Sequence, residues 1–214
     1  MKEKGIFTSL FRLDTPFMRF CERGADLVLL NVLYVLTSLP LISHGLAKLA
    51  LFASLETLMK ERKIALLKVY FKALQDKWPL GLQLALIEGS VCGICLLNLF
   101  LFYQAPGFLF QLVRLLSVSL WIFFQLLFLV VYPLAARREW KILPLFQSSF
   151  LLLGLHFPWF FLLGAAYLLF FSLAYLSGIS LLASLFFLLL IGFSLEAFVR
   201  LKIIGKILSA YPNL

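Results

Sequence analysis

The feature that most constrains this chain is a series of long apolar runs separated by short clusters of charged residues. The first run, from Leu27 to Leu39, contains only Asn31, Thr37 and Ser38 as polar side chains. A helix needs roughly 17–25 such residues to cross the hydrocarbon core of a bilayer. Hydrophobic residues make up 63% of the chain and charged residues 14%, against about 25% charged residues in soluble domains. The sequence therefore predicts an all-α, multi-pass membrane protein whose apolar side chains face lipid.

Six apolar segments are candidate membrane crossings. They are residues 24–40, 45–59, 80–102, 111–135, 158–175 and 179–199. The second of these is ambiguous, because it is short and contains Lys48 and Glu56, and charged groups are costly to place in a bilayer. We expect six transmembrane helices, or five if residues 45–59 form a re-entrant or surface helix.

The positions of the basic residues favour six crossings. If residues 45–59 cross, then every Lys and Arg except Lys48 and Arg114 falls on one side of the membrane. Cytoplasmic loops are enriched in Lys and Arg, so this arrangement predicts a bacterial cytoplasmic membrane protein with both termini in the cytoplasm. The net charge of +9 is assigned to contact with anionic lipids of the cytoplasmic leaflet, and not to nucleic acid, because the charges form no stripe on a soluble face.

The whole chain, residues 1–214, is predicted to form a single integral membrane domain. Basic and aromatic residues at helical spacing in residues 60–78 indicate an amphipathic helix that lies flat on the cytoplasmic leaflet. The predicted order is an interfacial lead-in at 1–23, a hairpin at 24–59, the amphipathic helix at 60–78, a hairpin at 80–135, an interfacial segment at 142–157, a hairpin at 158–199 and a basic tail at 200–214.

Ionisable residues inside predicted crossings are the candidates for a functional site, because such groups normally face the interior of a helix bundle. Glu88 is the deepest of them, about eight residues into its crossing, and Lys48, Glu56 and Arg114 complete the set. Glu88 could line a proton or solute path. The favoured alternative is a structural ion pair, with Lys48 across the first hairpin or with Arg114. Glu196, near a cytoplasmic end, is expected to be a topological or capping group.

Ala85, Gly89 and Gly93 are spaced by four residues, which predicts a face on which another helix packs closely. Cys92 and Cys95 form a CxxC motif inside an apolar helix, with no second ligand pair at metal spacing, so we interpret them as packing residues. We find no phosphate loop, nucleophile elbow or HExxH motif. We therefore expect no enzymatic activity, no metal and no cofactor.

Several segments resemble the YesL-like family of bacterial integral membrane proteins, a family of unknown function. The resemblance lies in LDTPFMRF at 13–20, ADLVLLN at 25–31, SLP at 38–40, VYFKALQDKW at 69–78 and YPLAAR at 132–137. The family is linked with carbohydrate uptake systems of the ABC type. This resemblance implies a role alongside sugar import and carries no catalytic residues over to this chain.

Two functions follow as hypotheses. The first is an accessory or scaffold component that contacts an ABC-type sugar permease, or another copy of itself, through amphipathic helices and small-residue faces. The alternative is a small-solute transporter in which Glu88 lines the path.

Overall fold

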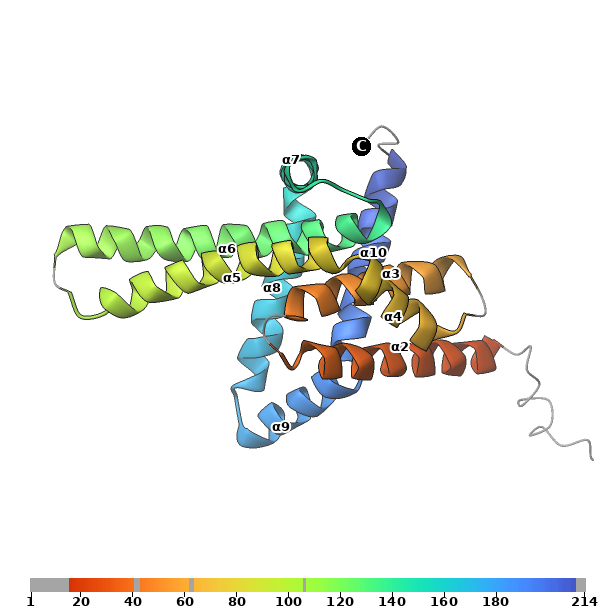
Figure 1. The fold of residues 1–214 in the computed structure, drawn as a ribbon. Helices are drawn as coiled ribbons and strands as arrows, with labels where there is room; N and C mark the ends of the chain where they lie inside the picture. The colour runs from red at the N-terminus through yellow and green to blue at the C-terminus, as the bar shows by residue number, and fades with distance from the viewer. Residues whose placement is uncertain (1–15, 41–42, 62–63, 106, 211–214) are drawn as a thin grey trace, which may run out of the picture.

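The computed structural model describes residues 16–40, 43–61, 64–105 and 107–210, and within these ranges the chain forms helices and no strand. The all-helical prediction is confirmed for this part of the chain. The elements in order are α2 (Pro16–Ser38), α3 (His44–Lys60), α4 (Leu66–Asp76), α5 (Trp78–Leu101), α6 (Phe108–Arg137), α7 (Ile142–Leu155), α8 (Phe157–Ala174), α9 (Gly178–Phe187), the π-helical turn η2 (Leu188–Gly192) and α10 (Phe193–Ala210) (Figure 1).

Four helical segments in the described ranges are long and apolar enough to cross a membrane. They are α5, α6, α8 and the continuous segment Gly178–Ser209 that joins α9, η2 and α10. α2 and α3 are not among them: α2 carries Glu22, Arg23 and Asp26, and α3 has only 17 residues, which include Lys48 and Glu56. The assignment to the membrane therefore rests on four helices, and the count of six crossings stays a prediction.

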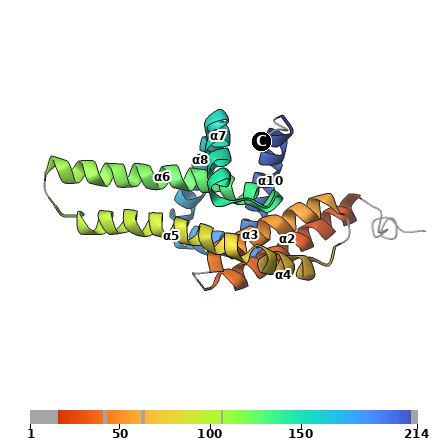
Figure 2. The same ribbon diagram turned by 45° about the horizontal axis from the view of Figure 1, so that its top comes forward.

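α3 is the central helix of the molecule, surrounded by α2, α4, α5, α6 and α10 (Figure 2). Nine of its side chains or glycine positions are buried: Gly45, Ala47, Leu49, Ala50, Leu51, Phe52, Ser54, Leu55 and Leu58. Its charged residues consequently meet groups from neighbouring helices, which explains how a short charged helix can occupy the middle of an apolar protein.

Two glycines allow α3 and α5 to approach closely. A Cβ atom at Gly45 would lie 2.7 Å from the Cβ of Ala85 and 2.9 Å from the hydroxyl oxygen of Tyr132. A Cβ atom at Gly81 would lie 2.8 Å from the Cα of Leu46. These contacts fix the first turn of α3 against α5 and α6.

α5 and α6 form an antiparallel arm whose outer part extends away from the other helices (Figure 1). In α6 the side chains of residues 127–136 are all buried, whereas in residues 108–126 only Ser117 is buried. Ser117 lies 3.4 Å from the amide nitrogen of Asn98, which donates to its hydroxyl across the arm. The outer arm is thus a largely apolar surface, and the Asn98–Ser117 contact joins its two helices by their side chains.

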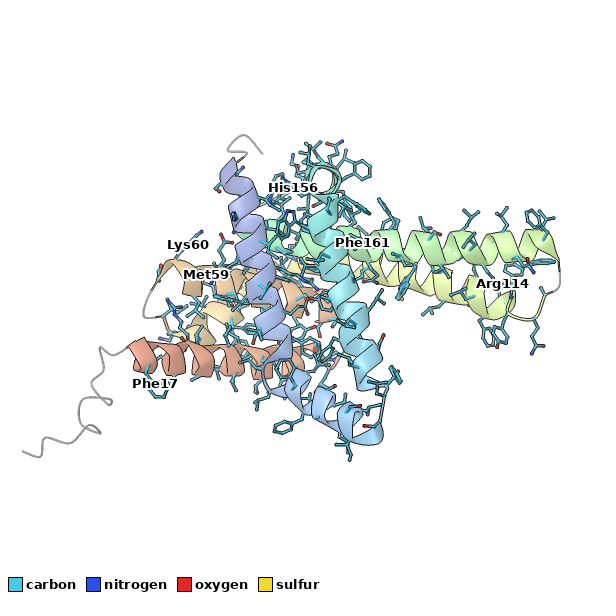
Figure 3. All side chains as sticks on the ribbon, turned by 180° about the vertical axis from the view of Figure 1, so that it is seen from behind. Phe17, Met59, Lys60, Arg114, His156 and Phe161 are labelled. Atoms are coloured by element: carbon cyan, nitrogen blue, oxygen red, sulfur yellow. The ribbon has the colours of Figure 1, made fainter. Side chains whose placement is uncertain are left out.

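The last hairpin differs from the arm in direction. α8 and α10 run across the line of α5 and α6 in both views, with α9 at the far end of the pair (Figures 1 and 3). The η2 turn breaks the α-helical pattern between α9 and α10. α10 packs on α2, α3 and α6 and so closes the core from one side.

Helices extend into both terminal segments of the predicted order. The lead-in at 1–23 falls partly on residues 1–15, outside the described ranges, and its remainder belongs to α2, because Pro16 stands at the helix start, where proline is tolerated. The predicted tail at 200–214 is helical through Ala210, since no proline interrupts it before that point. Residues 211–214 lie outside the described ranges.

α4 replaces the predicted amphipathic helix over a shorter range. Leu66 and Tyr70 on one face are buried, while Leu67 and Phe71 are exposed. The Tyr70 hydroxyl lies 2.6 Å from the hydroxyl of Thr37 on α2, and burial raises the pKa of Tyr70 to about 12. α4 is therefore anchored to the core by one face, and its position relative to a lipid surface remains a proposal.

Candidate functional site: a polar cavity around Glu88

Glu88 on α5 stands at the centre of a polar group contributed by three helices. The ammonium of Lys48, in the first turns of α3, donates to Glu88 Oε1 at 2.7 Å. The hydroxyl of Tyr132, on the buried part of α6, donates to Glu88 Oε2 at 2.6 Å. Lys48 Nζ also lies 5.1 Å from the centroid of the Tyr132 ring, within cation–π range. Both carboxylate oxygens of Glu88 are therefore satisfied by specific donors.

The close contact at Gly45 produces this geometry. Because no side chain separates Gly45 from Ala85, the first turn of α3 lies directly against α5, which brings Lys48 beside Glu88. The Tyr132 hydroxyl occupies the remaining space next to Gly45. The sequence hypothesis of a Glu88–Lys48 pair across the first hairpin thus corresponds to a pair in the structure, whereas Arg114 is far from Glu88.

The group lines a cavity of about 250 Å³ between α2, α3, α5, α6 and α10. Its polar walls are formed by Tyr34, His44, Lys48, Glu88, Gln125, Tyr132, Glu196 and Arg200. Side chains of Lys48 and Glu88 keep 25% and 14% of their surface exposed. This exposure means that the pair borders open space, unlike a fully packed ion pair.

A second charged pair forms the opposite wall of the cavity. Glu196 and Arg200, one turn apart on α10, make an ion pair. Arg200 also donates to the Tyr167 hydroxyl on α8, from Nε at 3.2 Å and from a terminal nitrogen at 2.9 Å. The sequence predicts a topological or capping role for Glu196, and the i,i+4 spacing of Glu196 and Arg200 is the pattern that indicates the ion pair.

The charged side chains that line the cavity carry no net charge as a set. Lys48 offsets Glu88, and Arg200 offsets Glu196. The tyrosines, His44 and Gln125 add hydrogen-bonding groups without a fixed charge. Such a lining can bind a polar group with no net charge, because a further charge would lack a partner in surroundings that are otherwise apolar.

Asn31 fixes the helix that carries the second pair. It is fully buried on α2, and its amide nitrogen donates to the carbonyl oxygens of Leu188 at 2.9 Å and Leu189 at 2.7 Å. Its side-chain oxygen accepts from the backbone N–H of Ser194 at 3.0 Å. A π turn displaces backbone groups from their usual i→i−4 partners, and Asn31 satisfies three of them. In the sequence, Asn31 stands out only as one of three polar residues in an apolar run.

The other charged candidates lie elsewhere. Glu56, near the far end of α3, is 3.1 Å from Lys60 Nζ and 3.7 Å from Arg137 Nε. Arg114 donates to the carbonyl oxygen of Tyr103 at 3.0 Å, near the tip of the arm (Figure 3). The structure therefore brings together Glu88 and Lys48, and separates them from Glu56 and Arg114.

Of the predicted small-residue face on α5, only the first residue packs closely against another helix. Ala85 packs against Gly45 of α3, but a Cβ atom at Gly89 or Gly93 would meet nothing within 4 Å. The correction follows from the direction of the arm: beyond Glu88, α5 leaves the core, and no helix of the described chain covers these two glycines.

Lys77, between α4 and α5, binds the carboxyl end of α6. Its ammonium donates to the carbonyl oxygens of Ala135 and Ala136, each at 2.9 Å. Burial lowers the pKa of Lys77, while Glu56, Glu139 and Asp76 act in the opposite direction. A cation at this position compensates the partial negative charge of a helix end.

Within the described ranges, no group of three or more His, Cys, Asp or Glu side chains is placed to hold a metal ion. Cys92 is half-buried and Cys95 is buried, and both are free thiols. A role for them in packing stays the interpretation of the CxxC motif.

Curated proteins and solved structures gave no match. Residues 27–99, which run from α2 to near the end of α5, match a family model. This range contains Lys48 and Glu88 but excludes Tyr132, Glu196 and Arg200. The model that residues 27–99 match is described as "Protein of unknown function, DUF624", and it covers about a third of the chain.

Proposed function

We propose that this chain binds a small, net-neutral polar solute in the Glu88 cavity and moves it across a membrane. The observation that carries the proposal is the cavity of about 250 Å³ with its two balanced ion pairs inside an otherwise apolar helical protein. Ligand sites commonly combine apolar walls with a few converging polar groups. The same arrangement is typical of binding sites inside membrane transporters, where ionisable residues face the bundle interior.

In this proposal, Glu88 is the residue that binds the solute. Its two oxygens are held by Lys48 and Tyr132, so the carboxylate has a fixed orientation at the cavity wall. A solute hydroxyl or amide that displaces one of these donors would gain a charge-assisted hydrogen bond. This exchange gives the site a way to bind and release a neutral molecule.

Reconstituted vesicles test this proposal. Stopped-flow light scattering would follow the entry of glycerol, erythritol and xylitol into vesicles that contain the wild-type chain, Glu88→Gln or Ser90→Ala. Ser90 is exposed on the same helix and its hydroxyl bonds only to the carbonyl of Leu86, so it is a matched control. We expect entry of at least one polyol above that of empty vesicles, retained in Ser90→Ala and lost in Glu88→Gln. Entry rates equal to empty vesicles for all three polyols would contradict the proposal.

An accessory role beside an ABC-type carbohydrate uptake system is the second candidate. It is favoured by the arm, on which Gly89 and Gly93 leave open space for close approach of a helix. Crosslinking from a cysteine placed at Ser90, followed by mass spectrometry of the captured membrane proteins, tests it. An ABC permease captured in near-equal amount would support the accessory role, whereas crosslinks to lipid-facing positions of random proteins would oppose it.

The proposed topology retains six crossings in the bacterial cytoplasmic membrane with both termini inside. The basic clusters at the chain ends and at 60–77 and 137–141 support it. A cysteine reporter at Ser43, between α2 and α3, should react with an impermeant reagent added outside the cell. Reaction only from the inside would contradict six crossings.

A further inference from the structure

A second cavity borders α10 next to the Glu88 cavity. It has a volume of about 320 Å³ and is formed by α8 together with the α9–η2–α10 segment. Its walls are almost entirely apolar and include Phe170, Phe171, Phe187, Leu188, Leu195 and Val199. We call it the α8–α10 groove. Figure 3 shows the two helices running alongside each other, with Phe161 labelled on α8.

The groove and the Glu88 cavity share a wall. Phe193 and Glu196, on consecutive turns of α10, line both spaces. The two spaces are further joined by a polar contact, because Arg200 lines the polar cavity and donates to the hydroxyl of Tyr167, which lines the groove. The boundary between the polar space and the apolar space is therefore made of side chains, with Arg200 and Tyr167 in direct contact across it.

We propose that the ligand of this protein is a single-chain amphiphile, with a neutral polar head in the Glu88 cavity and an alkyl chain in the α8–α10 groove. This inference rests on the proposed function, in which the Glu88 cavity binds a polar group. The balanced ion pairs Glu88–Lys48 and Glu196–Arg200 favour a head without net charge, because an extra charge would have no partner there. The apolar groove walls favour a hydrocarbon chain over a second polar group.

The size of the groove limits the chain. A water molecule occupies about 30 Å³ in the liquid, and a methylene group is of similar size, so the groove holds on the order of ten such groups. Monooctanoylglycerol is therefore a suitable probe, because it joins a neutral head with two hydroxyls to one short chain.

A photoreactive monooctanoylglycerol with a diazirine near the end of its chain tests the inference in nanodiscs that contain the whole protein. After illumination, peptide mass spectrometry would locate the crosslinks. We expect crosslinks concentrated at groove residues such as Phe170, Phe187 and Val199, well above those at Leu96 and Leu115, which are exposed on the arm. Excess unlabelled monooctanoylglycerol should suppress the groove crosslinks, and glycerol or octanoate at the same concentration should suppress them much less.

Variants in the polar cavity distinguish a bound amphiphile from bulk lipid that merely fills the groove. Tyr132→Phe and Glu88→Gln lie outside the groove, yet each should lower groove crosslinking by about fivefold, the effect of losing one ordinary hydrogen bond to the head. Crosslinking at Leu96 and Leu115 should not change, and Ser90→Ala should behave as wild type. The two substitutions are conservative in shape, so one folded variant is sufficient.

Two results would overturn the inference: equal crosslinking of the groove and the arm, or groove crosslinking that neither cavity variant changes. The proposed function is judged separately. Polyol entry that depends on Glu88, combined with cavity-independent crosslinking, would leave the solute site standing and remove the amphiphile. Cavity-dependent crosslinking without polyol entry would support the amphiphile and a polar-group site in the cavity, and would remove the transport of small polar solutes.

Discussion

α3 and the outer part of the α5–α6 arm have opposite surroundings, although both are apolar helical segments. α3 is short, carries Lys48 and Glu56, and is buried on nearly every side by other helices. The outer arm is long and nearly uncharged, and most of its side chains are exposed. In a membrane protein, hydropathy therefore identifies the segments that contact lipid better than those that form the core. The charged helix is the one that organises the polar site.

The largest expected difference between the two regions comes from removing a leucine side chain. Leu55 of α3 is fully buried, so Leu55→Ala should destabilise the protein by about 2–5 kcal/mol through the lost contacts and the cavity left behind. Leu96 on the arm is 57% exposed, and Leu96→Ala should cost far less. Unfolding by sodium dodecyl sulfate in bicelles, followed by circular dichroism, measures both. Equal costs would mean that the arm is as tightly packed as α3.

Two asparagines sharpen the same comparison. Asn31→Leu leaves the carbonyl oxygens of Leu188 and Leu189 and the N–H of Ser194 without their partner, and we expect a loss of about 3 kcal/mol. Asn98 makes one long contact, with Ser117, so Asn98→Leu should cost less than about 1 kcal/mol. The same unfolding measurement applies. If Asn31→Leu is no more harmful than Asn98→Leu, then Asn31 does not hold the π turn.

Replacing a glycine by alanine should lower the stability of the protein in α3 but not in the arm. Gly45→Ala places a Cβ atom against Ala85 and Tyr132, and the resulting shift should cost about 1–3 kcal/mol. Gly89→Ala meets open space and removes a flexible residue from a helix, so stability should be unchanged or slightly higher. The unfolding midpoints of the two variants, together with the slopes of their unfolding transitions, measure the two changes in stability. Tolerance of alanine at Gly45 would show that α3 and α5 are not in close contact.

The last comparison concerns Lys48 and Arg114, the two basic residues outside the basic clusters of the sequence. Lys48→Met should cost about 1–3 kcal/mol, because the mostly buried Glu88 carboxylate would lose its counter-charge and keep Tyr132 as a donor. Arg114→Met removes a bond to one exposed carbonyl oxygen and should have almost no effect. If Arg114→Met lowers the stability as much as Lys48→Met does, then Arg114 has a structural role that its contacts do not indicate.

Local sequence patterns were sufficient to predict the helical class and most helix positions, because long apolar runs and proline positions act locally. The pairing of Lys48 with Glu88 was also within reach, since few intramembrane charges were available. Tyr132, Arg200 and Asn31 could not be assigned, because their roles depend on how α6, α10 and α2 meet in space. The direction of the arm, which leaves Gly89 and Gly93 open, likewise depends on tertiary packing that a small-residue spacing does not specify.

The most direct test of the account is whether water-soluble molecules reach the Glu88 cavity within a membrane. Gln125→Cys would place a thiol at the cavity wall, and Phe123→Cys, two residues away on α6, would place one on an exposed apolar surface. Both are made in a background with Cys21, Cys92 and Cys95 replaced by serine, and each is treated in vesicles with a charged methanethiosulfonate reagent. We predict fast reaction at position 125 and little at position 123. Equal or slower reaction at position 125 would show that the Glu88 group is a sealed structural network that water-soluble molecules do not reach.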